Sequence, residues 1–429
     1  MKRIGTVALK LMFVAPSLSE AAHSPISVDG VECARLAELH IDKQVNLRAT
    51  MIRIECGLEE GPSGWNGRKD DQEQLGPIAN GPGGPTNVNT ITDETSPFTQ
   101  SESMVWSSDG NTIVVLYNDY QPPPFSGISV STDGGATFTR LLPSPFSTGH
   151  GSNAGDPVVV YNAALGSWFA GYLVGGCDGV GLWTSPDGLN WTPGACATPG
   201  GADRESMWVD NNPASPYYGR MYISWNRTRF GLLLMSTYSD DGIAWSPPLQ
   251  LTTNFIRNVQ ITGSPTDGTV FIAGMDEGGC AFNNRTNLMY RSLDGGNNWT
   301  RIVMGPPFAP PGDSVCGYFT KMDPIWRYMG WGQPGVGPNG VVHYAYAGRG
   351  INTGDTGDIY YTSSQDNGDT WSDSIVLNGD AAEGGIGSQW MPSLSVSTNG
   401  QVQVSWYDRR NSTDGMNYEY WGSARPITA

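Results

Sequence analysis

The chain has 429 residues, which allows two or three ordinary domains or one large all-β domain. Glycine (57) and proline (30) are abundant, tryptophan (15) and tyrosine (18) are frequent, and only 15% of residues are charged, which is typical of a turn-dense β protein and excludes a coiled coil or helical bundle. The net charge of −17 disfavours contact with a phosphate backbone, so nucleic acid is not an expected partner.

The N-terminal region divides into three parts. Residues 1–22 resemble a signal peptide because a basic start precedes a mostly apolar stretch, although Lys10 interrupts that stretch. Residues 23–56 are expected to form a short helical extension. Residues 57–95 are expected to form a Gly/Pro-rich linker, with a strand near 87–90 that closes the ring of the following domain. The chain has no run of 18 apolar residues, so no membrane span is expected.

Six cysteines fall into pairs that are local in the sequence, and none forms a CxxC motif. We expect three disulfides, which indicates an oxidising compartment and a secreted or periplasmic protein; six free buried thiols are the alternative. The expected pairs are Cys33–Cys56, Cys177–Cys196 and Cys280–Cys316.

One motif, Ser-x-Asp-(x)-Gly-x-x-Trp/Phe, occurs five times. Its copies are STDGGATF (131–138), SPDGLNW (185–191), SDDGIAW (239–245), SLDGGNNW (292–299) and SQDNGDTW (364–371). The motif suits a tight turn because Ser and Asp side chains bond nearby backbone N–H groups and Gly adopts positive φ. A period near fifty residues, with short strands between the turns, indicates a propeller.

A second repeat is a strand that ends in Tyr or Trp, as in TIVVLY (112–117), RMYISW (220–225), VVHYAY (341–346) and QVQVSW (401–406). Counting both repeats predicts six units, the last without the turn motif. The fold class is therefore all-β: a six-bladed β-propeller of four-stranded antiparallel blades over residues 96–429. The fifth unit is longer than the others, and we interpret the Gly/Pro-rich stretch 330–339 as an inserted loop over one face.

The motif is the Asp box, and the chain resembles bacterial sialidase-like proteins with BNR repeats over about residues 97–426. Asp203–Asp210 and Trp406–Arg410 add to this resemblance. It implies a six-bladed propeller and a glycoside-acting hydrolase. The Phe/Tyr-Arg-Ile-Pro motif of that family is missing, and the nearest string, Met51–Glu55, lies outside the propeller.

The first strand of each blade lines the channel of a propeller, so charged residues at strand starts are candidates for function. Aligning these starts by their apolar pattern gives Glu102, Asp156, Glu205, Arg257, Asp323 and Met391. The ends of the second strands should lie at the same face of the propeller as the first-strand starts, opposite the Asp boxes. The four carboxylates Glu102, Asp156, Glu205 and Asp323 are also the candidate ligands of a Ca²⁺ ion.

The resemblance to sialidases implies arginines that hold a substrate carboxylate, a tyrosine nucleophile and carboxylic acids that move protons. Trp390 and Tyr407 are candidates for stacking on a sugar ring. The candidate catalytic residues are Glu102, Asp119, Asp156, Glu205, Tyr407 and Asp408, and the candidate substrate-binding residues are Arg204, Arg257, Arg349, Arg409, Arg410 and Trp390.

Three functions remain open. The favoured one is a secreted, sialidase-like hydrolase that acts on a glycoside at the channel mouth and requires no cofactor. The others are a Ca²⁺-dependent propeller hydrolase of the lactonase or phosphotriesterase type, and a propeller that binds glycans or proteins without catalysis. The expected partner is a small-molecule or glycan substrate, and the expected state is a monomer.

Overall fold

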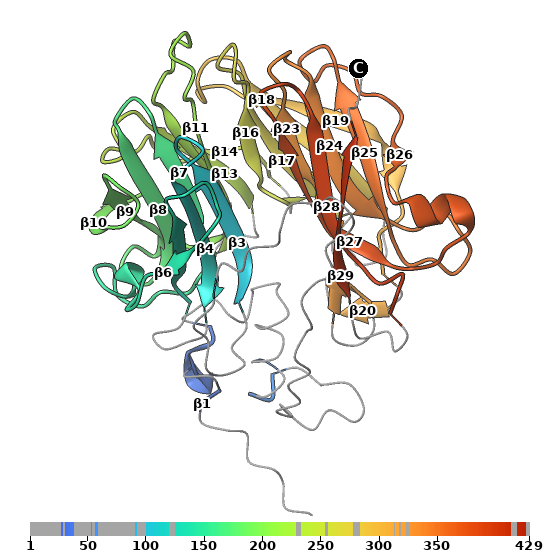
Figure 1. Ribbon diagram of the computed structural model, residues 1–429, viewed down its shortest axis with the longest axis horizontal. Helices are drawn as coiled ribbons and strands as arrows, with labels where there is room; N and C mark the ends of the chain where they lie inside the picture. The colour runs from blue at the N-terminus through green and yellow to red at the C-terminus, as the bar shows by residue number, and fades with distance from the viewer. Residues whose placement is uncertain are drawn as a thin grey trace, which may run out of the picture.

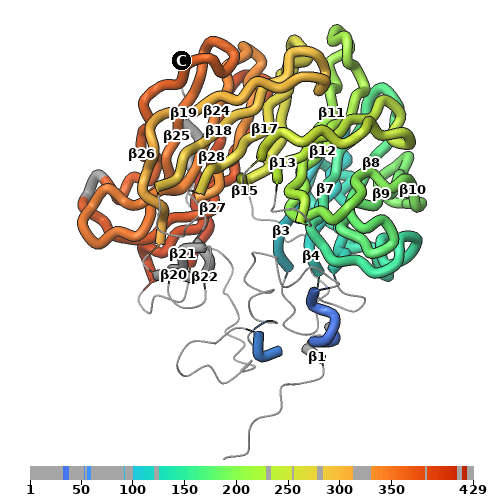
Figure 2. Tube along the Cα trace, turned by 180° about the vertical axis from the view of Figure 1, so that it is seen from behind, coloured from blue at the N-terminus to red at the C-terminus, as the bar shows by residue number. Residues whose placement is uncertain are grey.

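A computed structural model of the chain describes residues 27–28, 31–37, 53, 56–58, 91, 100–119, 125–228, 233–253, 256–277, 284–312, 314–316, 319–322, 326–328, 330–412 and 418–425. These residues form a six-bladed β-propeller of antiparallel sheets that follow one another in chain order (Figures 1 and 2). The expected signal peptide (1–22) and nearly all of the expected linker lie outside the described residues. The described part contains no helix long and apolar enough to cross a bilayer.

The first three blades each contain four strands in meander order. They consist of β3 (Gln100–Ser107), β4 (Ile113–Asp119), β5 (Gly127–Ser131) and β6 (Thr139–Arg140); β7 (Val158–Asn162), β8 (Ser167–Val174), β9 (Gly179–Ser185) and β10 (Thr192–Cys196); and β11 (Ala202–Val209), β12 (Met221–Arg227), β13 (Leu233–Ser239) and β14 (Leu249–Gln250).

Two of the last three blades vary this plan, whereas the fifth keeps four strands in meander order. In the fourth blade two short strands share the innermost position, and in the sixth blade three strands are described. These blades consist of β15 (Ile256–Arg257), β16 (Ile261–Gly263), β17 (Val270–Asp276), β18 (Arg285–Ser292) and β19 (Thr300–Phe308); β23 (Gln333–Val336), β24 (Val342–Gly348), β25 (Asp358–Ser364) and β26 (Ile375–Val376); and β27 (Gln389–Val396), β28 (Val402–Asp408) and β29 (Glu419–Arg425).

The fifth blade corrects one prediction. Residues 330–339 are not an inserted loop, because they include β23, the innermost strand of that blade. The insertion is instead a separate three-stranded sheet, β20 (Ser314–Cys316), β21 (Phe319–Met322) and β22 (Trp326–Tyr328). Asp323 lies outside the described residues, between β21 and β22, so it does not begin the first strand of a blade.

The core lies between neighbouring blades, where the second strands are buried on both faces. All seven residues of β24 are buried, for example, which explains why the sequence there is a continuous apolar run rather than an alternating one. Bulky aromatic side chains fill the space between sheets, including Trp168, Trp183 and Trp225.

The five repeated motifs fold into the same turn. In the first, the Ser131 hydroxyl donates to Asp133 (2.7 Å) and accepts from the Gly135 N–H (2.8 Å), while Asp133 also accepts from the Thr137 N–H (2.9 Å). The hydroxyl and backbone N–H of Thr137 are the main reasons that the pKa of Asp133 falls to about 2. These turns join the third and fourth strands, at the end of each blade remote from the first-strand starts.

Replacing Trp299 with Ala should lower the stability of the propeller. Trp299 closes the fourth repeated turn, donates from its ring N–H to the Gly296 carbonyl (3.1 Å) and packs against the core between the third and fourth blades. Because the ring is only partly buried, we expect a loss of about 2–4 kcal/mol in the free energy of unfolding. Urea denaturation measures this loss, and an unchanged midpoint would contradict the packing role.

The N-terminal extension is described only in pieces. It contains a two-stranded ribbon, β1 (Ser27–Val28) and β2 (Val31–Glu32), followed by a single 3-10 turn, η1 (Cys33–Arg35). Two of the expected disulfides are confirmed, Cys33–Cys56 and Cys177–Cys196. The pairing of Cys280 with Cys316 stays a prediction because Cys280 lies outside the described residues.

Candidate functional site

Strand register gathers the candidate residues at one end of the propeller. In four blades the first residue of the innermost strand pairs with the last residue of the second strand, as in Gln100 with Asp119 and Gln389 with Asp408. In the second and fifth blades the first residue pairs three positions before that end. The starts of the first strands and the ends of the second strands therefore share one end of the propeller, and the repeated turns occupy the other. This is the arrangement that the sequence predicts.

The innermost strands share an unusual backbone feature near their starts. In five blades a non-glycine residue there has φ between 48° and 60°: Glu102, Asp156, Arg204, Asn258 and Met391. In the first, third and sixth blades the strand register shifts at this point, which is the mark of a β-bulge. Such left-handed residues cost about 1–3 kcal/mol each, and strain of this kind is concentrated at functional sites.

The bulges correct the sequence alignment of two blades. In the third blade the equivalent of Glu102 and Asp156 is Arg204, not Glu205, and in the fourth it is Asn258, not Arg257. The bulge inserts one extra residue, which an apolar pattern of period two cannot locate. Each alignment is therefore wrong by one position.

Glu102 and Asp156 form an acidic pair between the first two blades. The Asn118 amide connects them, since its Nδ2 donates to Glu102 (2.8 Å) and its Oδ1 accepts from the Asp156 N–H (2.8 Å). Asp156 as a whole is half-exposed, but its Oδ1 is buried and has no hydrogen-bond partner in the described part of the chain. Burial first, and then the neighbouring Glu102, hold the pKa of Asp156 well above its usual range.

Glu205 is a second carboxyl group with an unusual environment. The residue is 6% exposed, and neither carboxyl oxygen has a hydrogen-bond partner among the described residues. Burial is the main reason that the pKa of Glu205 lies well above its usual range. Glu205 therefore gives up its proton only at a higher pH than a free glutamate does, and once ionised it adds a negative charge that raises the pKa of Asp156.

Two arginines and a tryptophan complete the site. The Arg204 and Arg257 guanidinium carbons lie 4.1 and 4.8 Å from the centre of the Trp331 ring, whose N–H donates to Glu277 (2.9 Å). Arg257 is buried and pairs with Asp203 at 2.9 Å. Arg204 is half-exposed and makes no ion pair in the described structure; burial and the nearby Arg257 lower its pKa to about 10.

We call this set the inner cluster: Glu102, Asp156, Asp203, Arg204, Glu205, Arg257, Glu277 and Trp331. The sequence predicts five of its members, Glu102, Asp156, Arg204, Glu205 and Arg257. It does not single out Asp203 or Trp331, because Asp203 is adjacent to two stronger candidates and Trp331 lies in the stretch interpreted as a loop. Gly332 next to it has to be glycine, since a Cβ there would lie 2.3 Å from the Ala345 carbonyl oxygen.

Other predicted residues have structural partners instead. Asp119 is buried and forms an ion pair with Arg140. Asp408 is buried and accepts hydrogen bonds from Trp406, Gln389 and Arg410, and Arg410 also pairs with Asp380 at 3.2 Å. These groups brace the ends of the second strands, so the catalytic roles predicted for Asp119 and Asp408 and the binding role of Arg410 are not supported.

The predicted aromatic residues lie in a packed group on the sixth blade. Trp390 is 2% exposed and packs against Tyr407 (5.7 Å) and Tyr418 (5.8 Å), so it presents no face to a sugar ring. Burial raises the pKa of Tyr407 to about 12, which disfavours its ionisation as a nucleophile. Arg349 and Arg409 are half-buried at the site end of the fifth and sixth blades, where their binding role stays a prediction.

The carboxylates do not form a Ca²⁺ site within the described residues. Among the described residues, one group of three His, Cys, Asp or Glu side chains has ligand atoms within 4.8 Å of one another. This group is His150, Cys177 and Cys196, and the two cysteines form a disulfide. The oxygens of Glu102, Asp156 and Glu205 do not converge in this way, and Arg204 lies beside them. Asp323, the fourth predicted ligand, lies outside the described residues, so the Ca²⁺ site stays a prediction.

The site's acidic groups predict how stability depends on pH. The folded-state pKa of Glu205 is raised. Its contribution to the free energy of unfolding is therefore greatest below the ordinary pKa of 4.5 and is lost as pH rises through the raised pKa. Glu205→Gln should therefore raise the melting temperature at about pH 8, with a gain that shrinks toward about pH 4.5. Melting curves of wild type and variant across this range measure the gain, and a constant difference would contradict the assignment.

Comparison with known proteins finds no matching family model and no match among curated proteins. Solved structures do align. A thermostable family-43 glycoside hydrolase is 13% identical (63% of this chain, 88% of that chain, TM-score 0.34). A Penicillium chrysogenum α-L-arabinanase complexed with arabinobiose is 15% identical (63% and 80%, TM-score 0.39), and an Aleuria aurantia lectin mutant with α-methyl-L-fucoside is 10% identical (76% and 94%, TM-score 0.42). At such identities and scores the likeness carries no information on activity.

Proposed function

We propose that the protein is a glycoside hydrolase that acts at the inner cluster, with Asp156 as the general acid. One observation carries the proposal: Asp156 is half-exposed, is held in a left-handed backbone conformation, and has a raised pKa beside Glu102 and Arg204. A carboxylic acid with a raised pKa keeps its proton to a higher pH than a free aspartate does and can protonate the oxygen of a leaving alcohol.

The other groups of the cluster have distinct roles in this proposal. Glu102 is the second carboxyl group, which the Asn118 amide connects to Asp156. Arg204 is the binding group for an electron-rich substituent of the substrate, since the residue is only partly buried and has no ion-pair partner in the described structure. Glu205, buried behind Asp156, is a positioning residue that keeps the pKa of Asp156 high.

The resemblance to sialidase-like proteins supports a glycoside as the substrate, while the sialidase activity itself lacks the family's arginine motif. The abundance of polar and ionisable groups at the site also supports a polyhydroxylated ligand. Two disulfides support a location in an oxidising compartment, either secreted or periplasmic.

The test is hydrolysis of a panel of 4-nitrophenyl glycosides that includes neutral sugars and uronic acids, together with a fluorogenic sialoside. We expect turnover of at least one member that EDTA does not abolish and that Asp156→Asn removes. Asp241→Asn is the matched control because Asp241 lies in a repeated turn at the opposite end of the propeller. If no glycoside is cleaved but sugars bind in a manner that depends on Arg204, the protein is a glycan-binding propeller and the hydrolase proposal is wrong.

A further inference from the structure

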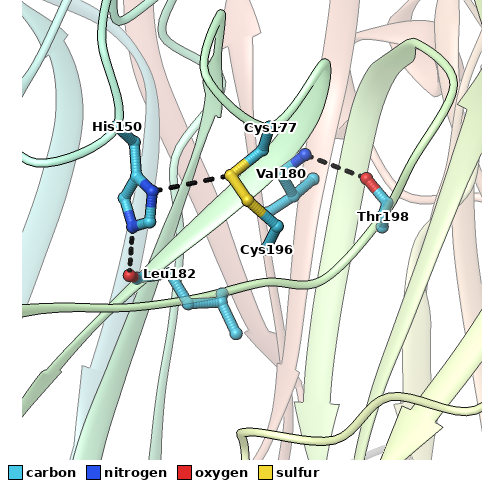
Figure 3. The surroundings of a disulfide bond; sticks show 6 residues. All are labelled: His150, Cys177, Val180, Leu182, Cys196 and Thr198. Atoms are coloured by element: carbon cyan, nitrogen blue, oxygen red, sulfur yellow. Dashed lines mark hydrogen bonds between the residues drawn. A yellow bond between two sulfur atoms is a disulfide. The ribbon is translucent and has the colours of Figure 1, made fainter.

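The Cys177–Cys196 disulfide lies at the same end of the propeller as the inner cluster and has a histidine beside it (Figure 3). Cys177 belongs to the turn between β8 and β9, and Cys196 is the last residue of β10 and pairs with Gly181 near the start of β9. Asp156 precedes β7, whose first residue, Val158, pairs with Gly171 near the end of β8. The disulfide and Asp156 are therefore at one end of the second blade.

The hydrogen bonds of His150 fix which of its nitrogens faces the sulfur. Its Nε2 lies 2.9 Å from the Leu182 carbonyl oxygen, which can only accept, so Nε2 carries a proton. Its Nδ1 lies 3.5 Å from the Cys177 sulfur. The ring is held by edge-to-face packing on Trp183 at 4.6 Å, so Nδ1 stays directed at Cys177 (Figure 3).

The two sulfur atoms differ in exposure and surroundings, which determines the sulfur that an incoming thiolate would attack. Cys196 is exposed, whereas Cys177 is partly buried next to the imidazole. A leaving thiolate at Cys177 would be stabilised by a protonated His150, and stabilisation of the leaving thiolate accelerates exchange. Among the described residues the other disulfide, Cys33–Cys56, has no hydrogen bond from a histidine.

We propose that Cys177–Cys196 is a thiol-exchange site that a small thiol opens at Cys196. The thiolate of the incoming molecule attacks the Cys196 sulfur, a new mixed disulfide forms there, and the Cys177–Cys196 bond breaks. The electron pair of that bond remains on Cys177 as a thiolate, which accepts a hydrogen bond from His150 after Nδ1 has taken a proton from solvent. The incoming thiol has lost its own proton to solvent, so atoms and charge balance.

Opening this bond would loosen the segments that lead into the inner cluster. The Gly176 N–H donates to the His150 carbonyl (2.8 Å) six residues before Asp156, and the Gly201 N–H donates to the Asp178 carbonyl (2.7 Å) two residues before Asp203. The disulfide therefore helps to hold the segments that precede the innermost strands β7 and β11. The exchange chemistry stands by itself, and only its effect on turnover rests on the proposed function.

The experiment incubates the intact protein with reduced glutathione, quenches with an alkylating agent and maps cysteine peptides by mass spectrometry. We expect glutathione on Cys196 and the alkylating agent on Cys177, while Cys33–Cys56 remains closed as the internal reference. In His150→Phe, which keeps an aromatic ring against Trp183, the rate of opening should fall roughly tenfold. His150→Gln serves in the same assay if the Phe variant does not fold.

Three results would overturn the exchange site: glutathione on Cys177 instead of Cys196, opening of Cys33–Cys56 first, or the same rate in wild type and both His150 variants. Turnover of a glycoside is recorded in parallel. Selective opening at Cys196 without glycosidase activity would uphold the exchange site and count against the hydrolase, so the two proposals fail separately.

Discussion

Asp156→Asn is expected to lose about 10²–10⁴-fold in hydrolytic rate, the usual contribution of a general acid. The substitution keeps the shape of the side chain but removes the transferable proton. In wild type, activity should fall as pH rises through the raised pKa of Asp156, because the acid form is then depleted. Initial rates on the best substrate of the panel, measured from about pH 4 to about pH 9, test both statements.

The stability of Asp156→Asn separates loss of chemistry from loss of fold. Burial disfavours the charged form of Asp156, so the neutral amide should melt no lower than wild type at about pH 8. An inactive variant with an intact melting transition supports the acid role. Full activity in Asp156→Asn, with Asp241→Asn as the reference, would remove Asp156 from the mechanism.

Arg257→Leu is expected to destabilise the protein by about 3–5 kcal/mol, which is the cost of leaving a buried charge without its partner. Arg257 is 1% exposed and forms a buried ion pair with Asp203. The sequence alone predicts that loss of Arg257 weakens ligand binding more than stability, whereas the structure predicts the reverse. Urea denaturation gives the free energy of unfolding directly.

The double variant Arg257→Leu/Asp203→Leu tests whether the ion pair causes this loss. Replacing both partners leaves no unpaired charge, so the double variant should recover most of the stability that the single variant loses. Arg204→Leu is the matched comparison because Arg204 stacks on the same Trp331 ring but makes no ion pair in the described structure. If the single and double variants unfold alike, the loss comes from packing on Trp331.

The repeats made the fold predictable. Five copies of one turn motif, together with the repeated second strands, indicated six blades, which the structure confirms. The fifth blade was the exception, because the strand Gln333–Val336 consists of Gln, Pro, Gly and Val, a composition that resembles a loop. Its neighbour Gly332 is required by contact with the second strand, which the sequence does not show.

The site was predictable only in part. Charged residues at strand starts indicated Glu102 and Asp156, and the structure brings these two residues together through Asn118, while their roles stay a prediction. The sequence alignment of the first strands was wrong by one residue in the third and fourth blades, because a period-two pattern does not locate the extra residue there. Arg257 and Asp119 could not be recognised as buried ion-pair partners, because pairing between distant segments leaves no local pattern in the sequence.

The central claim is that the pKa of Asp156 lies well above the ordinary aspartate value of 3.8. Carbon-13 NMR of protein labelled at the aspartate carboxyl carbons measures this directly, with Asp156→Asn used to assign the signal. The account predicts one carboxyl signal that titrates well above the ordinary aspartate value and that is missing from the variant. If the Asp156 signal instead titrates at or below the ordinary aspartate value of 3.8, the proposed acid and the site built around it are wrong.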